Sequence, residues 1–482
     1  MKAPAFTIDT IEFGERPVTF RMPFRFGAAT LDAAPQAFVR ARIRMADGKE
    51  TWGHSAEMMM PKWFDKDPLL TYGQNIDQLR CCLMLARDAY VGDRTSSTAF
   101  GHHARNYSQT ISSAARNRLP LLAAGFGPAL IDRAVIDAFC RALSKSFFDV
   151  MQCNAVGFDP VLLLPEFAGF SAPTFLSRLT PLPDVALRHT IGLADPIDAS
   201  DPAPTTSDTL PWHLVDVIAK YRPRYFKIKL CGELPRDIDR LRRIDAVIEH
   251  AAPDCLLTLD GNEQFADHGA LADFWIALRS DSSAEKFVRR ILWIEQPLPR
   301  AIALSQPVAD VEVPLMIDES DDALDAFPRA RALGYRGVSS KSCKGLYKSL
   351  VNVARAARWN AEKSTDLGAV KPFFVSAEDL TMQAGIAVQQ DLALVSLIGI
   401  THVERNGHHY VNGMAGAPVA EQRAYLAAHP DLYESDGDVV RLSIRDGMLS
   451  TRSLHGSGFS SLVEPDWRHM HEMVEPRCPP SD

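Results

Sequence analysis

The chain has 482 residues, 46% of them hydrophobic, so it can bury more than one core. It carries 60 acidic and 52 basic residues, a net charge of −8, which argues against nucleic acid binding because that function needs a clustered basic surface. Residues 1–10 lack a basic patch followed by an apolar stretch, and the longest apolar runs are too short to span a bilayer. We therefore expect a cytoplasmic protein that binds neither nucleic acid nor a membrane.

The eight cysteines lie far apart except for the adjacent pair Cys81 and Cys82, and none shows the C-x-x-C spacing typical of zinc or redox sites. A free cysteine behaves as a small core residue. We therefore predict buried, reduced thiols.

Residues 1–153 have the pattern of an α+β domain. Apolar residues alternate with arginines from Val39 to Met45, and Asp47-Gly48 then supplies a turn, which predicts an antiparallel hairpin. Helical patterns follow at roughly 73–92 and 127–151. Residues 154–188 are rich in Pro and Phe without a clear period, and we interpret them as a connecting insertion.

From residue 189 to residue 415 an apolar run, a turn and a helical pattern repeat. We predict eight strands, at His189–Leu193, Tyr225–Leu230, Leu256–Asp260, Ile291–Glu295, Pro314–Asp318, Gly337–Lys341, Phe373–Ala377 and Ile398–Glu404. Strands that alternate with helices form a parallel sheet, and eight such units fit a closed (β/α)8 barrel of the α/β class. A doubly wound open sheet is the alternative, but no G-x-G-x-x-G follows a strand.

Residues 416–482 form a C-terminal segment with one more hairpin signal, Val439–Ser443 followed by Asp446-Gly447. We expect this segment to pack back on the N-terminal domain.

Five charged sites end successive runs of the predicted barrel. They are Lys227-Ile228-Lys229, Asp260, Glu295, Asp318 and Lys341. The carboxyl ends of barrel strands meet at one mouth, so the three acids would crowd together and need a cation. Carboxylate oxygens suit a hard ion that keeps open positions, which favours Mg²⁺, with Mn²⁺ as the alternative.

The lysines of this series would lie on both sides of that ion. Alternate residues of a strand share a face, so Lys227 and Lys229 would point inward, with Lys341 across the mouth. Two lysines placed in this way could serve the two faces of one carbon. Lys344 competes with Lys341 for the role. Taken singly, each of these residues also has a simpler interpretation, as part of a solvated strand or a turn.

At these residues the chain resembles the enolase superfamily, in its mandelate racemase and muconate lactonizing branch. The resemblance rests on Pro23-Phe-Arg-Phe-Gly27, Trp52-Gly53, the K-x-K pair, Asp260-Gly-Asn262, Trp293-Ile-Glu-Gln-Pro297, Ile317-Asp-Glu-Ser320 and Lys341-Ser-Cys-Lys-Gly345. It implies a modified TIM-like barrel at 189–415 with an N-terminal α+β capping domain at 1–153.

The resemblance also implies roles for the series. Asp260, Glu295 and Asp318 would bind Mg²⁺, which chelates the carboxylate of a small-molecule substrate. Lys229 and Lys341 would be the acid/base pair, and Lys227 would neutralise an enediolate. Two lysines, without a histidine in the seventh run, favour racemisation, epimerisation or cycloisomerisation. We also expect a homo-oligomer.

Six further residues are candidates for substrate contact. Asn262 and Glu319 lie in the matched motifs. Glu404 ends the last predicted strand and His408 follows it, where a polar rim of loop hydrogen bonds is the alternative. Arg25 and Trp63 belong to the cap, either as part of a lid or as ordinary core.

Three other functions stay open at this point. The first is an acid-sugar dehydratase of the same superfamily. The second is a metal-independent barrel glycosidase that uses Glu295 and Glu404 as its carboxylate pair. The third is a catalytically silent barrel that binds an acid without converting it.

Overall fold

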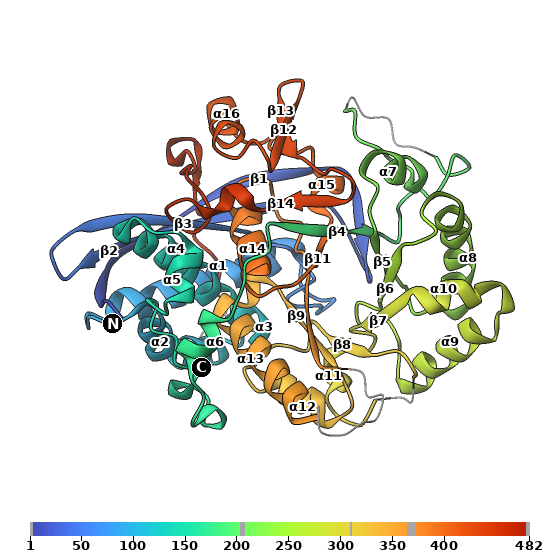
Figure 1. Ribbon diagram of the computed structural model, residues 1–482, viewed down its shortest axis with the longest axis horizontal. Helices are drawn as coiled ribbons and strands as arrows, with labels where there is room; N and C mark the ends of the chain where they lie inside the picture. The colour runs from blue at the N-terminus through green and yellow to red at the C-terminus, as the bar shows by residue number, and fades with distance from the viewer. Residues whose placement is uncertain (1–2, 203–207, 309–310, 364–371, 479–482) are drawn as a thin grey trace.

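The computed structural model describes residues 3–202, 208–308, 311–363 and 372–478. Figure 1 shows an N-terminal domain, the cap, in blue and teal beside a barrel coloured green to orange, with the C-terminal segment in red near the junction. No helix within the described ranges combines the length and apolar character that crossing a membrane requires.

The cap is an antiparallel sheet covered by helices. Strands β1 (Phe6–Phe26), β2 (Ala29–Met45) and β3 (Glu50–Met58) pair in order, and β15 (His471–Glu472) joins the edge of β1. The predicted alternation is confirmed, since Val39, Ala41 and Ile43 are buried while the arginines between them are not. Gly53 allows helix α4 (Phe126–Leu143) to pack closely on β3, because a Cβ there would lie 2.0 Å from the Ala138 nitrogen.

The helices of the cap differ in part from the predicted ones. Helix α1 (Tyr72–Gly92) matches the first predicted helix. The pattern at 127–151 is two helices, since α4 ends where Ser144 turns left-handed (φ 52°) and α5 (Phe147–Gln152) begins after an N-cap at Ser146. Helix α2 (Ala99–Arg116) was not predicted; the short α3 (Leu121–Ala124) follows it.

The stretch after the cap packs on the barrel. It forms η1 (Pro160–Leu162), η2 (Pro165–Phe167) and α6 (Ala172–Ser177), with Phe167 and Leu176 fully buried. Its Glu166 accepts a hydrogen bond of 2.7 Å from Arg355 Nε of helix α13 (Leu346–Lys363). The first barrel strand starts at residue 184, earlier than predicted.

Eight parallel strands close the barrel, and the predicted (β/α)8 architecture is confirmed. In chain order they are β4 (Asp184–Ile191), β5 (Tyr225–Lys229), β6 (Leu256–Asp260), β7 (Ile291–Glu295), β8 (Leu315–Ile317), β9 (Gly337–Ser340), β10 (Phe374–Ala377) and β11 (His402–Arg405). Each strand pairs with the next, and β11 pairs with β4. This closure excludes the doubly wound open sheet.

Helices cover the outside of the barrel. They are α7 (Leu214–Tyr221), α8 (Leu234–Ala251), α9 (His268–Ser280), α10 (Glu285–Arg290), α11 (Arg300–Ala303), α12 (Ala326–Ala332), α13 and α14 (Ile386–Leu397), with 3-10 turns η3 (Ser282–Ala284) and η4 (Ser342–Lys344). Every residue of α14 is buried, because this helix lies between the barrel and the cap. Gln390 on it donates a 2.7 Å hydrogen bond to the carbonyl oxygen of His54 on β3.

The C-terminal segment contacts both the barrel and the cap. Its elements are α16 (Val419–Ala428), β12 (Tyr433–Asp436), β13 (Val439–Leu442), β14 (Met448–Ser450), η5 (Arg452–His455), η6 (Trp467–His469) and β15, and the short α15 (Gly407–Tyr410) precedes it directly after β11. Strand β14 pairs with β4 of the barrel, and β15 pairs with β1 of the cap. The hairpin itself is β12–β13, whereas Asp446-Gly447 leads into β14.

The prediction of reduced, buried cysteines is wrong at several positions. Cys81 of α1 and Cys478 form a disulfide bond with Cα atoms 5.7 Å apart. Cys153 is exposed and Cys231 is half-buried, while Cys82, Cys140, Cys255 and Cys343 are buried free thiols. A separation of 397 residues hid the Cys81–Cys478 pair, because only the return of the tail to the cap brings the two side chains together.

Candidate active site

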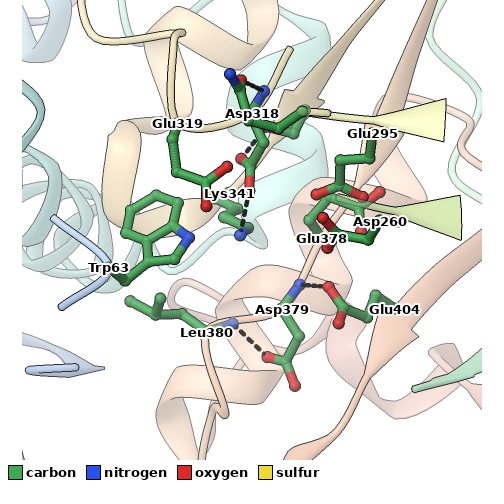
Figure 2. Close-up of polar contacts among 12 residues, drawn as sticks. Trp63, Asp260, Glu295, Asp318, Glu319, Lys341, Glu378, Asp379, Leu380 and Glu404 are labelled. Carbon is green, nitrogen blue, oxygen red and sulfur yellow. Dashed lines mark hydrogen bonds and ion pairs between the residues drawn. The ribbon is translucent and has the colours of Figure 1, made fainter. Parts of the chain in front are cut away.

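The charged series comes together at the carboxyl ends of the barrel strands. Lys227 and Lys229 lie on β5, Asp260 ends β6, Glu295 ends β7, Asp318 follows β8 and Lys341 follows β9. Each of these residues is at most 5% exposed. Figure 2 shows the three acids and Lys341 around one space, with Trp63 on the cap side. Parallel strands in register deliver side chains from distant parts of the sequence to a single point.

Lys227 is the centre of the cluster. Its Nζ atom lies 2.9 Å from Asp260, 2.8 Å from Glu295, 2.8 Å from Glu378 and 2.9 Å from Glu404. Burial lowers the pKa of Lys227, but the attraction of the four carboxylates outweighs it and holds the pKa well above its ordinary value. Lys227 is therefore a fixed positive charge.

Lys229 and Lys341 contact different carboxylates on opposite sides of the barrel. Lys229 Nζ lies 2.6 Å from Asp260 Oδ2, and Lys341 Nζ lies 2.6 Å from Asp318 Oδ2. Their strands, β5 and β9, are separated by three strands in either direction around the closed barrel. Burial opposes the charge of Lys341, yet Asp318 raises its pKa above the ordinary value.

Lys344 occupies a different position from Lys341. It lies in η4, where its Nζ donates to Ser339 Oγ at 2.6 Å and lies 3.0 Å from Asp321 Oδ2 and 3.4 Å from Asp318 Oδ1. Ser339 in turn hydrogen-bonds Asp318. Lys344 thus packs behind Asp318, which leaves Lys341 as the lysine beside the cap.

Two members of the cluster were missed in the sequence. Glu378 lies directly after β10 and forms a fully buried ion pair with Arg188 of β4. Arg188 also lies over the Trp293 ring, 5.2 Å from its centroid. The seventh run ends in acids just as the third, fourth and fifth do, and that signal could have found Glu378. Nothing local indicated Arg188, because its partner is 190 residues away.

Of the candidates near the last strand, Glu404 joins the cluster and His408 does not. Glu404 accepts hydrogen bonds from Thr190 Oγ1 at 2.7 Å and from the Asp379 amide at 3.0 Å, besides its contact with Lys227. The His408 ring packs on Tyr221, and its Nε2 lies 3.3 Å from His189 Nδ1. Burial lowers the pKa of His408 well below its ordinary value.

On the cap side, Trp63 covers Lys341, with Nζ 4.3 Å from the ring centroid. Glu319 accepts hydrogen bonds from Asn262 Nδ2 at 3.3 Å and from Lys66 Nζ at 3.2 Å. Trp63, Asn262 and Glu319 therefore border the site. The Arg25 side chain is exposed, and its carbonyl oxygen accepts a hydrogen bond from the Leu193 amide of the barrel at 3.3 Å.

The donor set suits a hard dication. Both carboxylate oxygens of Glu295 are buried and accept no hydrogen bond, although Lys227 Nζ forms an ion pair with Oε2 at 2.8 Å, and burial raises the pKa of this carboxyl well above its usual range. Among the described residues, no three His, Cys, Asp or Glu side chains are arranged to hold a metal ion. Lys227 and Lys341 form ion pairs with carboxylate oxygens of this set. The residue types at these three strand ends nevertheless fit Mg²⁺.

The amino-acid sequence matches no protein-family model, and a comparison with curated protein sequences finds no significant match. Solved structures do match along nearly the whole chain. The 2-chloromuconate cycloisomerase of Rhodococcus opacus has a TM-score of 0.58 and 17% identity, over 96% of this chain and 98% of that one. A dipeptide epimerase of Cytophaga hutchinsonii, complexed with Mg and a dipeptide, has a TM-score of 0.58 and 13% identity over the same shares.

A Bradyrhizobium enolase complexed with magnesium and mandelic acid matches as well, with a TM-score of 0.56 and 15% identity over 97% of this chain and 98% of that one. The chain shares the fold of these solved structures. The fold expected from the sequence motifs is therefore confirmed, including the cap and the barrel.

Proposed function

We propose that the protein is a Mg²⁺-dependent enzyme that removes the α-proton of a carboxylate substrate and returns it, as a racemase or epimerase. The observation that carries this proposal is the opposition of Lys229 and Lys341, on strands half a barrel apart, each 2.6 Å from a separate carboxylate. A carbon between them would meet an amine on each face.

Each charged residue has one task in this proposal. Lys229 and Lys341 exchange the proton with the two faces of the α-carbon. Lys227, held by four carboxylates, contributes a fixed positive charge beside the developing enediolate. Asp260, Glu295 and Asp318 would hold Mg²⁺, which supplies Lewis-acid stabilisation of the substrate carboxylate. The solved relatives crystallised with magnesium support this assignment.

The charges of the cluster agree with such a ligand. Lysines contact each of the acids Asp260, Glu295 and Asp318, so the site mixes positive and negative groups that could face an acid and a cation.

Each alternative function predicts a different experimental result. The glycosidase pair Glu295 and Glu404 is bridged by Lys227, at 2.8 Å and 2.9 Å, and this ammonium occupies the space that a sugar ring would need. A dehydratase would convert the exchanging acid into a product with a new ketone group. A silent barrel would bind an acid without exchanging its proton.

Incubation with Mg²⁺ and pooled carboxylic acids in D₂O tests the proposal. The pool contains hydroxy acids, amino-acid derivatives, dipeptides and sugar acids, and NMR follows the α-proton signals. We expect exchange with inversion for one acid class, and its loss when a chelator removes Mg²⁺. No exchange with any class would refute the proposal, and chelator-resistant activity would refute the metal.

A further inference from the structure

A buried polar chain runs behind Lys341, outside the cluster described above. Ser342, the next residue in sequence, donates a 2.5 Å hydrogen bond from Oγ to Asp391 Oδ1 on α14. Asp391 forms an ion pair with Arg405 at the end of β11. Arg405 also donates to Asp379 Oδ1 at 3.2 Å. The chain therefore joins the ends of β9, β10 and β11 through helix α14.

These groups are removed from water, so they depend on one another for their hydrogen bonds. Ser342, Asp391, Arg405 and Asp379 are each at most 3% exposed. A buried charge is tolerated only while its partners stay in place, and removing one partner leaves the other charge uncompensated. A displacement of Asp391 would thus cost more than a similar displacement at the surface.

Asp391 is also anchored from the cap side. Its helix lies between barrel and cap, and the neighbouring residue Gln390 donates to the His54 carbonyl of β3 at 2.7 Å. Ser342 begins the turn η4, in which the Lys344 amide donates to the Lys341 carbonyl at 2.9 Å. The backbone of Lys341 is therefore fixed by a turn whose first residue is held by Asp391.

Lys229 has no part in this arrangement. It lies on β5, half a barrel away, and its partner is Asp260 at 2.6 Å. The far end of the chain does reach the cluster, because the Asp379 amide donates to Glu404 at 3.0 Å. The hydrogen bond between Ser342 and Asp391 is therefore the part of this chain that acts on Lys341 and not on Lys229.

We infer that Asp391, held by Arg405, is a positioning residue for Lys341 and acts through Ser342. This inference rests on the proposed function, in which Lys341 serves one face of the substrate carbon and Lys229 the other. The rate of proton transfer falls steeply as the amine is displaced from its position beside the carbon. Loss of the Ser342–Asp391 bond should therefore slow exchange on the Lys341 face and spare the Lys229 face.

The test uses the full-length protein with Mg²⁺ and an acid that the wild type exchanges. Lys229→Met and Lys341→Met first assign each stereoisomer to its lysine. Ser342→Ala and Asp391→Asn are then measured with each stereoisomer separately. We expect exchange on the Lys341 face to fall by about tenfold in kcat with little change in KM, as for other supporting residues of catalytic groups. The Lys229 face should stay near the wild-type rate.

Ser349→Ala is the matched control. Ser349 of α13 accepts a 2.8 Å hydrogen bond from Ser340, which precedes Lys341 in the chain, but it has no contact with the chain of Asp391. We expect both faces to keep their rates in this variant. Ser342→Thr retains a hydroxyl group and should recover most of the activity lost in Ser342→Ala.

The outcomes separate the two proposals. If wild type exchanges the acid but Ser342→Ala and Asp391→Asn slow both faces equally, or slow neither, the positioning role is wrong and the proposed function stands. If wild type exchanges no acid, the proposed function itself fails and the positioning role with it. Should Asp391→Asn not fold, Ser342→Ala, which removes one neutral group, decides the question.

Discussion

At the scale of single residues, Lys341 and Lys344 have different environments although they are only three positions apart in the chain. Lys341 lies between Asp318 and the Trp63 ring at the cap, whereas Lys344 bridges Ser339 and Asp321 behind Asp318. Lys341 therefore faces the cap, whereas Lys344 belongs to a buried group of ion pairs. In the proposed function, only Lys341 of the two serves the substrate carbon.

Replacing each of these lysines by methionine should separate the two roles. We expect Lys341→Met to lose 10²-fold or more of the exchange on its face, roughly the contribution of a positioned acid or base. Lys344→Met should keep most of the exchange but lose about 1.5–3 kcal/mol of unfolding free energy, because Asp321 loses one of two buried lysine partners and keeps Lys348 at 3.2 Å. Stereoisomer-resolved NMR and urea unfolding measure both. A Lys344→Met protein without exchange would reverse the assignment.

The buried carboxyl of Glu57 should make stability depend on pH. Burial raises the pKa of Glu57 from 4.5 to about 7, against the opposing effect of Arg133, 3.1 Å away. The folded state therefore holds this proton more tightly than the unfolded state, so its contribution is complete below pH 4.5 and is lost as the pH rises to about 7. The loss amounts to about 3 kcal/mol.

Urea unfolding of wild type and Glu57→Gln at pH 5 and pH 8 measures this effect, since the variant cannot titrate there. We expect the unfolding free energy of wild type to fall more between the two pH values than that of Glu57→Gln. Equal falls would show that Glu57 is ionised throughout.

At the scale of elements, the loop between β3 and α1 joins the cap to the barrel. Lys66 Nζ lies 2.6 Å from Glu263 and 3.2 Å from Glu319, both in loops that follow barrel strands. Arg300 donates to the carbonyl oxygens of Trp63 and Phe64, at 2.9 Å and 2.8 Å. These bonds hold Trp63 in its position over Lys341.

Lys66→Met should loosen this loop and weaken substrate binding. We expect KM to rise by roughly tenfold, since breaking one contact to a buried charge costs on the order of 1.5–3 kcal/mol. Both stereoisomers should be affected alike, in contrast to Ser342→Ala. Lys49→Met is the control, because Lys49 donates at 2.6 Å to Ala142 within the cap. An unchanged KM in Lys66→Met would show that the loop stays closed without Lys66.

At the scale of the whole molecule, the C-terminal segment ties the two domains together. Strand β14 extends the barrel sheet at β4, β15 extends the cap sheet at β1, and Cys478 is bonded to Cys81. A disulfide bond is typical of oxidising compartments. The cytoplasmic location expected from the sequence therefore stays a prediction.

Reduction of the Cys81–Cys478 bond should lower thermal stability. We expect a loss of about 2–5 kcal/mol, because the bond closes a long loop of the unfolded chain. The six free cysteines should react with a thiol reagent in denatured protein before reduction, and all eight after it. Cys478→Ser, measured by calorimetry, should match the reduced wild type. Eight reactive thiols without reduction would contradict the bond.

Much of the barrel and of the charged series followed from the sequence. A strand that ends in Asp260 or Glu295 leaves a local signal, because an apolar run stops at a charge. Helix α2 was missed because polar residues such as His102, His103 and Asn106 fill much of its buried face. The break at Ser144 was missed because a single left-handed residue leaves the apolar pattern on both sides unchanged. Arg188, Lys66 and Cys478 could not be assigned, because their partners lie far away in the chain.

The sequence by itself determined that the charged series reaches the mouth, since strand period and strand ends are local properties of the chain. The tertiary structure decided how those side chains pair. It enclosed Lys227 among four carboxylates, placed Lys229 and Lys341 on opposite strands and set Asp391 behind one of them. Such pairing depends on closure of the barrel and docking of the cap, because a buried charge settles only where partners from several elements meet.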